Sequence, residues 1–124
     1  MFEPFVYRGR LVEWRYAGNC RVDLDLGFGV ALPGKIVDLA GVHCPSPSEE
    51  EGAIVPSGAH GAALDFSNQF MPPGSKVILK VSRGAGNRWL AEIALAGNTV
   101  AGTVNEALVR AGHATRDEPE RHDD

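Results

Sequence analysis

Cysteine and histidine are the residue types in this chain that could bind a soft metal ion. Cys20, His43 and Cys44 offer thiol sulfur and imidazole nitrogen, which suit Zn²⁺ better than Ca²⁺. Two cysteines are too few for a disulfide framework, so we expect both to remain thiols in a reducing compartment. His60 and His113 are isolated at expected helical positions, where we expect a surface or capping role.

The charge of the chain bears on a second kind of chemistry, the binding or cleavage of nucleic acid. Its formal net charge is −4, with 12 Lys and Arg against 16 Asp and Glu. Nonspecific affinity for nucleic acid comes largely from basic side chains that release counterions, so this balance disfavours such a partner but leaves room for a local basic groove. The basic residues that could line one are Arg15, Arg21, Lys35, Lys76, Lys80, Arg83 and Arg88.

The length of 124 residues predicts one domain with a modest core. No segment approaches the roughly 18 consecutive apolar residues of a membrane span, so we expect no membrane partner. The first ten residues lack a basic stretch followed by an apolar one, which predicts no secretory signal and a cytoplasmic or intravirion setting. Residues 116–124 read R-D-E-P-E-R-H-D-D, which predicts a charged, disordered tail after a domain of residues 1–115.

Alternating apolar residues predict five β-strands. Residues 5–16 have the aromatic and β-branched content of a strand interrupted near Gly9, and residues 20–26 alternate apolar with charged positions. Gly27-Phe28-Gly29 predicts a tight reversal into a third strand at residues 30–42, with a bulge or kink at Pro33-Gly34. Residues 76–82 and 88–95 read as a second hairpin.

Two helices complete the predicted order of elements. Residues 44–58 contain three prolines and no periodicity, which predicts a surface loop. Ser57 is expected to cap a helix over residues 59–70, and Thr103 with Glu106 has the spacing of a capping box at the start of a second helix. The whole order predicts an α+β, mainly β, fold: a five-stranded barrel with two to three short helices packed against it.

Three motifs stand in the same order and with the same spacing as in one known family of small barrels. They are D-L-G-F-G at residues 25–29, N-R-W-L-A-E-I at residues 87–93 and V-N-E-A-L-V-R-A-G-H-A at residues 104–114. They resemble a hairpin of phage-encoded and bacterial members, the G-R-x-L-A-x-I strand and the V-N-E-x-L-V-R-x-G-x-A helix of the staphylococcal-nuclease (thermonuclease) family. The resemblance implies that the barrel is an OB-fold of the staphylococcal-nuclease type.

The family hydrolyses nucleic-acid phosphodiesters with one Ca²⁺ held mainly by two aspartates, and the resemblance places those two positions at Asn19 and His43. In the same motif, Asp38 stands where the family has a phosphate-binding arginine, and Ser46 stands where it has a glutamate that orients or deprotonates water. Only Arg88 keeps the family's residue, an arginine that would steady charge on the phosphoryl group. Its alternative role is a surface ion pair. The resemblance therefore implies a degenerate site with no cofactor.

Two metal alternatives remain open, Ca²⁺ with altered ligands and Zn²⁺. The resemblance brings Cys20, His43 and Cys44 to the old metal position, where Asp38 or Asn19 would have to complete a zinc site. Adjacent residues at a strand end tend to point to opposite faces, which works against His43 and Cys44 sharing one ion.

The sequence favours a non-enzymatic module that binds a protein partner or a second copy of itself. The resemblance around residues 25–29 adds a phage particle as its setting. Two other functions stay open: a metal-dependent nuclease with altered ligands, and a noncatalytic binder of single-stranded nucleic acid that uses the groove of the barrel.

Overall fold

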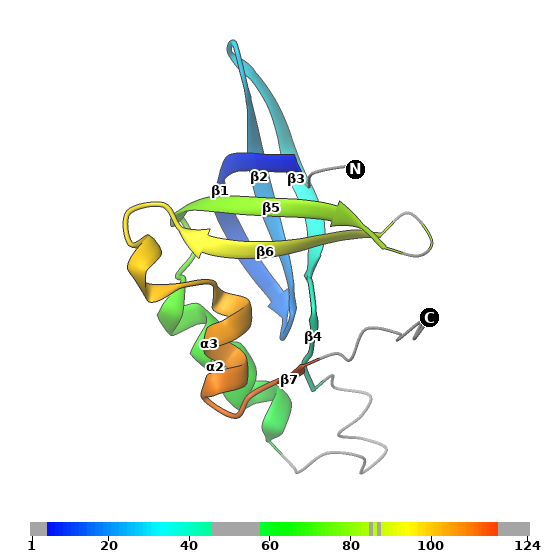
Figure 1. Ribbon diagram of the computed structural model, residues 1–124, viewed down its shortest axis with the longest axis vertical. Coiled ribbons are helices and arrows are strands. Elements are labelled where there is room, and N and C mark those ends of the chain that lie inside the picture. The colour runs from blue at the N-terminus through cyan, green and yellow to red at the C-terminus, as the bar shows by residue number, and fades with distance from the viewer. Residues whose placement is uncertain (1–4, 46–57, 85, 87, 117–124) are drawn as a thin grey trace, which may run out of the picture.

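Five strands form a closed barrel in the computed structural model, which describes residues 5–45, 58–84, 86 and 88–116 (Figure 1). The strands follow the order β1-β2-β3-β6-β5, and only β3 and β6 run parallel. This mixed barrel with two helices confirms the predicted OB-fold-like α+β class. The barrel strands are β1 (Phe5–Tyr16), β2 (Asn19–Gly27), β3 (Val30–Leu39), β5 (Lys76–Arg83) and β6 (Trp89–Leu95).

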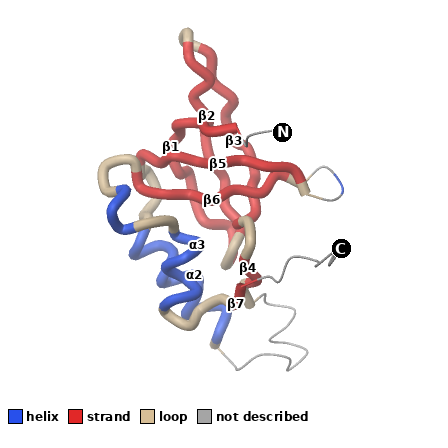
Figure 2. The backbone as a smooth tube through the Cα atoms, viewed as in Figure 1, coloured by secondary structure: helices blue, strands red, loops and turns tan. Residues whose placement is uncertain are grey.

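The helices gather at one end of the barrel (Figure 2). Helix α2 (Ala59–Phe70) packs against β1 and α3 (Val104–Arg110), and α3 packs against β6. The short 3-10 helix η2 (Thr99–Ala101) precedes α3. Neither described α-helix is long and apolar enough to cross a membrane.

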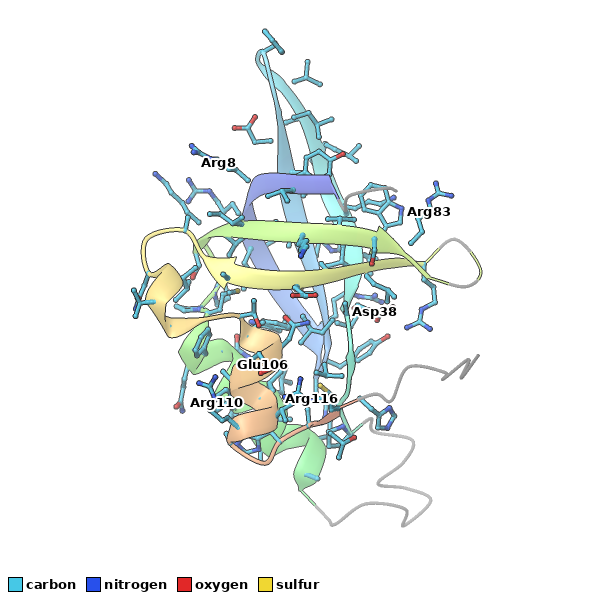
Figure 3. All side chains as sticks on the ribbon, in the orientation of Figure 1. Arg8, Asp38, Arg83, Glu106, Arg110 and Arg116 are labelled. Carbon is cyan, nitrogen blue, oxygen red and sulfur yellow. The ribbon has the colours of Figure 1, made fainter. Side chains whose placement is uncertain are left out.

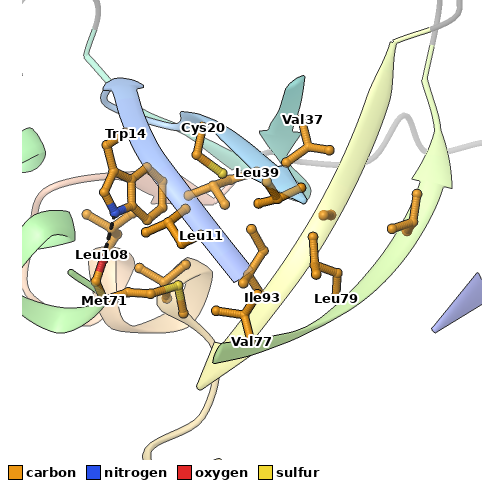
Figure 4. Close-up of a cluster of buried hydrophobic side chains, with 14 of the residues drawn as sticks. Leu11, Trp14, Cys20, Val37, Leu39, Met71, Val77, Leu79, Ile93 and Leu108 are labelled. Carbon is orange, nitrogen blue, oxygen red and sulfur yellow. Dashed lines mark hydrogen bonds between the residues drawn. The ribbon is translucent and has the colours of Figure 1, made fainter. Parts of the chain in front are cut away.

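Alternation along the strands builds the core, because every second side chain points into the barrel. Leu11, Val22, Val37, Leu79 and Ile93 are all buried in this way. At the helical end the indole of Trp14 joins the same cluster, and its Nε1 donates to the Met71 carbonyl at 3.0 Å (Figure 4). That bond satisfies the polar atom of a buried Trp and ties β1 to the end of α2.

The bulge expected at Pro33-Gly34 is confirmed. Val22 and Leu24 of β2 face Lys35 and Leu32 of β3, so β3 holds one extra residue between these pairs. Gly34 has a φ of 68°, and its N–H donates to Oδ1 of Asp23 at 2.8 Å. The carboxylate therefore caps the backbone group that the bulge removes from the ladder.

The predicted end of the third strand was wrong. The third strand ends at Leu39 and not at residue 42, because Gly41 adopts a φ of 75° and turns the chain into the separate strand β4 (Val42–His43). The predicted bounds of the first helix are confirmed, because α2 covers residues 59–70. Its N-cap is Gly58, with no side-chain cap, while Ser57 and most of the predicted loop lie outside the described residues.

Arg116 belongs to the folded domain and not to the predicted tail. It lies in β7 (Thr115–Arg116), which pairs antiparallel with β4. Its guanidinium donates to both carboxylate oxygens of Glu106, at 2.7 and 3.3 Å, and this hydrogen bonding lowers the pKa of the Glu106 carboxyl (Figure 3). Thr103 caps α3 as predicted by accepting the N–H of Glu106. Residues 117–124 lie outside the described part of the chain.

Asn105 is a buried amide that joins α3 to the two strands where the barrel closes. Its Nδ2 donates to the carbonyls of Ala40 and Ala91 at 2.8 and 3.0 Å, and its Oδ1 accepts the N–H of Ile93 at 3.2 Å. Only 3% of the residue is exposed. Its function here is structural, because all three partners are backbone groups.

We predict that Asn105→Ala lowers the free energy of unfolding by about 2–4 kcal/mol, because it leaves several buried backbone groups without their partner. Asn105→Asp keeps the volume and the acceptor but loses both donor bonds, so it should also destabilise the protein. Asn98→Ala removes an exposed amide and serves as the control, with an expected change within about 0.5 kcal/mol. Urea unfolding followed by circular dichroism measures all three, and an unchanged midpoint for Asn105→Ala would contradict this role.

Candidate functional site

Three of the five positions singled out by the family resemblance lie together at the closure of the barrel. Asn19 begins β2 and pairs with Asp38 on β3, and Asp38 is in turn the partner of Leu90 on β6. Arg88 directly precedes β6, so its side chain reaches the same spot. Ser46 lies outside the described residues, and His43 is exposed on β4.

A chain of hydrogen bonds links these side chains. Arg15 donates from Nη1 to Oδ1 of Asn19 at 3.0 Å, and Nδ2 of Asn19 donates to Oδ1 of Asp38 at 2.7 Å. Arg88 donates from Nε to Oδ2 of Asp38 at 3.0 Å, and its Nη2 lies 3.0 Å from the same oxygen. The order is therefore arginine, amide, carboxylate, arginine, with each donor facing an acceptor.

The amide at position 19 is the side chain that this chain of bonds requires. Arg15 can only donate and the ionised carboxylate of Asp38 can only accept, so the group between them must offer one acceptor and one donor. An amide does so, whereas a carboxylate at position 19 would set two negative charges at hydrogen-bond distance. Asn19 is 3% exposed, so water cannot readily replace either bond.

The arginine that keeps the family identity is already occupied. Both oxygens of Asp38 are engaged, one by Asn19 and the other by Arg88. A phosphate that approached Arg88 would have to compete with a carboxylate at 3.0 Å and would meet its negative charge. The alternative expectation for Arg88, a surface ion pair, is confirmed. This arrangement links neighbouring strands, and the Asp38 carboxylate partly neutralises the charge that Arg88 could offer a phosphoryl group.

The zinc set is not assembled. Cys20 is fully buried and belongs to the core cluster, whereas Cys44 is half-buried and His43 is exposed. In the part of the chain that the structure describes, no three His, Cys, Asp or Glu side chains gather to hold a metal ion. The two cysteines carry thiols and do not form a disulfide with each other. These side chains therefore do not fit the soft-ligand site considered from the sequence.

The histidines on the helical side make structural contacts. Nε2 of His60, near the start of α2, accepts the N–H of Ala17 at 3.3 Å and so connects this helix to the turn between β1 and β2. His113 follows α3, and its ring lies 5.1 Å from that of Phe66, centroid to centroid. The sequence predicted a surface or capping role for His60, but its side chain instead bonds to the turn that lies beside Asn19.

Several of the basic residues considered for a nucleic-acid groove have partners within the chain. Arg15 and Arg88 belong to the chain of bonds described above. Nε of Arg21 lies 3.4 Å from Oε2 of Glu13, and Nζ of Lys35 sits 4.0 Å from the centroid of the Trp89 ring. The carboxylates beside Arg21 and Arg88 reduce the positive charge available to a phosphate backbone, and Lys35 covers an aromatic face on which a base could stack.

Sequence reasoning missed Arg15 as a member of the site. It stands four residues before Asn19 across the turn at Ala17-Gly18, so the two side chains lie at the same end of neighbouring strands. A hairpin pairing drawn from the sequence could have indicated this proximity. The pairing of β1 with β2 shifts register between Trp14 and Tyr16, beside Arg15, and the alternation of residues does not reveal this shift.

Comparison with protein-family models and with curated proteins finds no match for this chain. The likeness to the staphylococcal-nuclease family therefore stays a prediction that rests on the three motifs.

We predict that Asn19→Asp destabilises the protein by about 1–3 kcal/mol at pH 7, because it replaces the donor to Asp38 with a second carboxylate. Adding Asp38→Asn should recover part of this loss, and a double-mutant cycle in urea gives the coupling between the two positions. Asn98→Asp makes the same change of charge at an exposed site and is the matched control. Equal stabilities for Asn19→Asp and the control would contradict the described bonding.

Burial of the thiol, with the nearby Asp38 carboxylate as a second cause, raises the pKa of Cys20 from 9.0 to about 12. Unfolding returns the thiol to its ordinary pKa, so the unfolded chain loses this proton first and stability falls as pH rises above about 9, by up to roughly 1.4 kcal/mol per pH unit. Urea titrations at pH 8 to 11 should show a steeper decline of the free energy of unfolding for the wild type than for Cys20→Ala.

At pH 8 we expect a thiol reagent to modify Cys44 first and Cys20 only on unfolding, because Cys20 is buried.

Proposed function

We propose that this protein is a non-enzymatic protein-binding module built on a nuclease-like barrel whose catalytic site is degenerate. The observation that carries the proposal is the pairing of Asp38 with Arg88, together with the amide of Asn19 on the other carboxylate oxygen. Three of the positions that would bind a divalent cation and a phosphate, Asn19, Asp38 and Arg88, instead bond to one another. This network supports a structural role for these residues.

Energetics support the loss of catalysis. Each charge-stabilising group in such a site contributes typically about 2–4 kcal/mol to lowering the barrier, although losses are not additive. Here Asp38 stands at one of the two arginine positions that the resemblance implies, and it forms an ion pair with Arg88 at the other. Asn19 and His43 stand at the two positions where the resemblance implies carboxylate ligands. A hard cation would find too little anionic oxygen at these positions.

The surface favours a protein over a nucleic acid as the partner. The chain carries a net charge of −4, and the basic residues at the barrel closure are engaged by neighbours. Large apolar side chains are instead exposed on the strands and at the turn between β2 and β3, among them Val6, Leu26, Phe28 and Val30. Exposed apolar groups that lie close together are typical of protein interfaces. The phage setting stays a prediction from the resemblance.

The test is incubation of the purified protein with labelled single-stranded DNA or RNA in Ca²⁺, Mg²⁺ or Zn²⁺, with a calcium-dependent nuclease as positive control. We expect neither cleavage nor a mobility shift at physiological salt. Cleavage that chelators abolish would overturn the proposal in favour of a nuclease with altered ligands. Retention without cleavage would overturn it in favour of a noncatalytic nucleic-acid binder.

A variant that restores the family residues makes the test sharper. It combines Asn19→Asp, Asp38→Arg, His43→Asp and Ser46→Glu. If the degenerate positions are what abolished catalysis and the altered chain still folds, calcium-dependent cleavage should appear in the variant and be absent from the wild type. Circular dichroism checks folding, because Asp38→Arg sets two guanidinium groups where an ion pair now stands.

A further inference from the structure

The hairpin of β2 and β3 extends beyond the wall of the barrel (Figures 1 and 2). The pairing of β2 with β1 stops at Asp25, which faces Arg8. Within the described residues, β3 pairs with β6 only at Asp38 and Leu39. The tip of the hairpin is therefore a two-stranded ribbon that no third strand supports.

One face of this ribbon is apolar and continues the core outward. Leu24 is buried in the barrel and pairs with Leu32 across the hairpin, and Leu26 and Val30 follow toward the tip. The exposed fraction rises along this path, from 1% at Leu24 to 36% at Leu32, 41% at Leu26, 53% at Val30 and 105% at Phe28. Residues 26–34 carry no charge. We call residues 26–32 the apolar finger.

Phe28 at the tip is unfavourable to the folded monomer in two ways, through the exposure of its ring and through its backbone conformation. Its ring is fully exposed to water. Its φ is 55°, and it is the sole non-glycine residue with a positive φ in the described part of the chain. A tight hairpin turn with positive φ favours Asn or Gly, and a bulky residue there is strained. An exposed aromatic ring held in an unfavourable backbone conformation indicates a role outside the monomer.

We infer that the apolar finger is a docking element whose Phe28 ring inserts into an uncharged, concave apolar pocket of a protein partner. This inference rests on the proposed function, because it names the surface by which the module binds. A single aromatic anchor that fills a pocket can supply most of the affinity of an interface. The absence of charge over residues 26–34 sets the chemistry of the pocket, since a buried unpaired charge on either side would oppose binding.

The backbone of the finger favours a protein pocket over a lipid bilayer. At its tip the ribbon has backbone N–H and C=O groups that no strand of the described chain pairs. Moving such groups into hydrocarbon costs several kcal/mol each, whereas a protein pocket can provide polar partners at its rim. The net charge of −4 also opposes attraction to an anionic membrane surface.

A second copy of the chain is a less suitable partner for the apolar finger than a different protein. Pro33 and the bulge at Gly34 interrupt the open edge of β3, features that discourage pairing with another strand. One hollow of the barrel surface is lined by Arg8, Arg10 and Lys76, and another by Asp38 and Arg88. Both carry charged side chains, so neither offers the uncharged pocket that the finger requires.

The first experiment locates the partner from the tip itself. A photoreactive benzoyl-phenylalanine replaces Phe28 in the full chain, produced in the cells that naturally make the protein. The same group at Val100, which is 96% exposed on η2, is the matched control. We expect a discrete cross-linked protein from position 28 that is absent from position 100 and that excess unlabelled wild-type chain competes away. Phe28→Asn chain should fail to compete.

The second experiment measures binding of the purified cross-linked protein to the wild type, Phe28→Asn and Val100→Asn by titration calorimetry. Asn suits the turn, so Phe28→Asn should fold at least as stably as the wild type. We expect it to weaken binding by about 30-fold or more, while Val100→Asn stays within about twofold. Equal affinities for the wild type and Phe28→Asn would sink the inference.

Two further measurements separate the other occupants of the finger. Sedimentation velocity of the chain alone tests a second copy, and flotation with phosphatidylcholine vesicles, with and without phosphatidylglycerol, tests a bilayer. Self-association or vesicle binding that Phe28→Asn abolishes would overturn the inference. A competed cross-link from position 100 with none from position 28 would also overturn it, yet would leave the proposed function standing. Nucleic-acid cleavage would instead remove the proposed function.

Discussion

The barrel depends on a short seam between β3 and β6. The other neighbouring strands share six or seven residue pairs, but these two share only Asp38 with Leu90 and Leu39 with Ala91. The seam is reinforced by the bond from the Ala40 N–H to the Ala91 carbonyl and by the buried amide of Asn105, which reaches both strands from α3. A helix side chain thus supplies hydrogen bonds that a longer ladder would otherwise provide.

The same seam explains why the side chains of the candidate site bond to one another. Asp38 lies on it and Arg88 stands at its end, so their pairing adds an ionic contact across the closure. Because Arg88 is largely exposed, the pair contributes little to stability, at most about 1 kcal/mol. Its chemical consequence is larger, since it occupies the one arginine that the resemblance retains. Asn19 and Arg15 extend the contact to the turn between β1 and β2.

Most of the fold could be predicted from the sequence because its signals are local. The alternation in β2 and β5, the reversal at Gly27-Phe28-Gly29 and the cap at Thr103 each involve residues a few positions apart. The pairing of β7 with β4 and the three bonds of Asn105 join distant segments and leave no periodic trace.

The positions of the candidate site came from the family motifs. That Asp38 would engage both Asn19 and Arg88 required the register of three strands. The exposure of Phe28 was also missed, although an aromatic residue between two glycines in a turn is itself an unusual signal.

The late position of β6 along the chain has a consequence for folding. Residues 5–39 can form their three-stranded meander early, but β3 has no neighbour on its outer side until residues 89–105 are present. Contacts so far apart in sequence form slowly, and an open strand edge can recruit other unfinished chains in the meantime. Pro33 and the bulge beside it interrupt that edge, so they limit aggregation during the interval before the barrel closes.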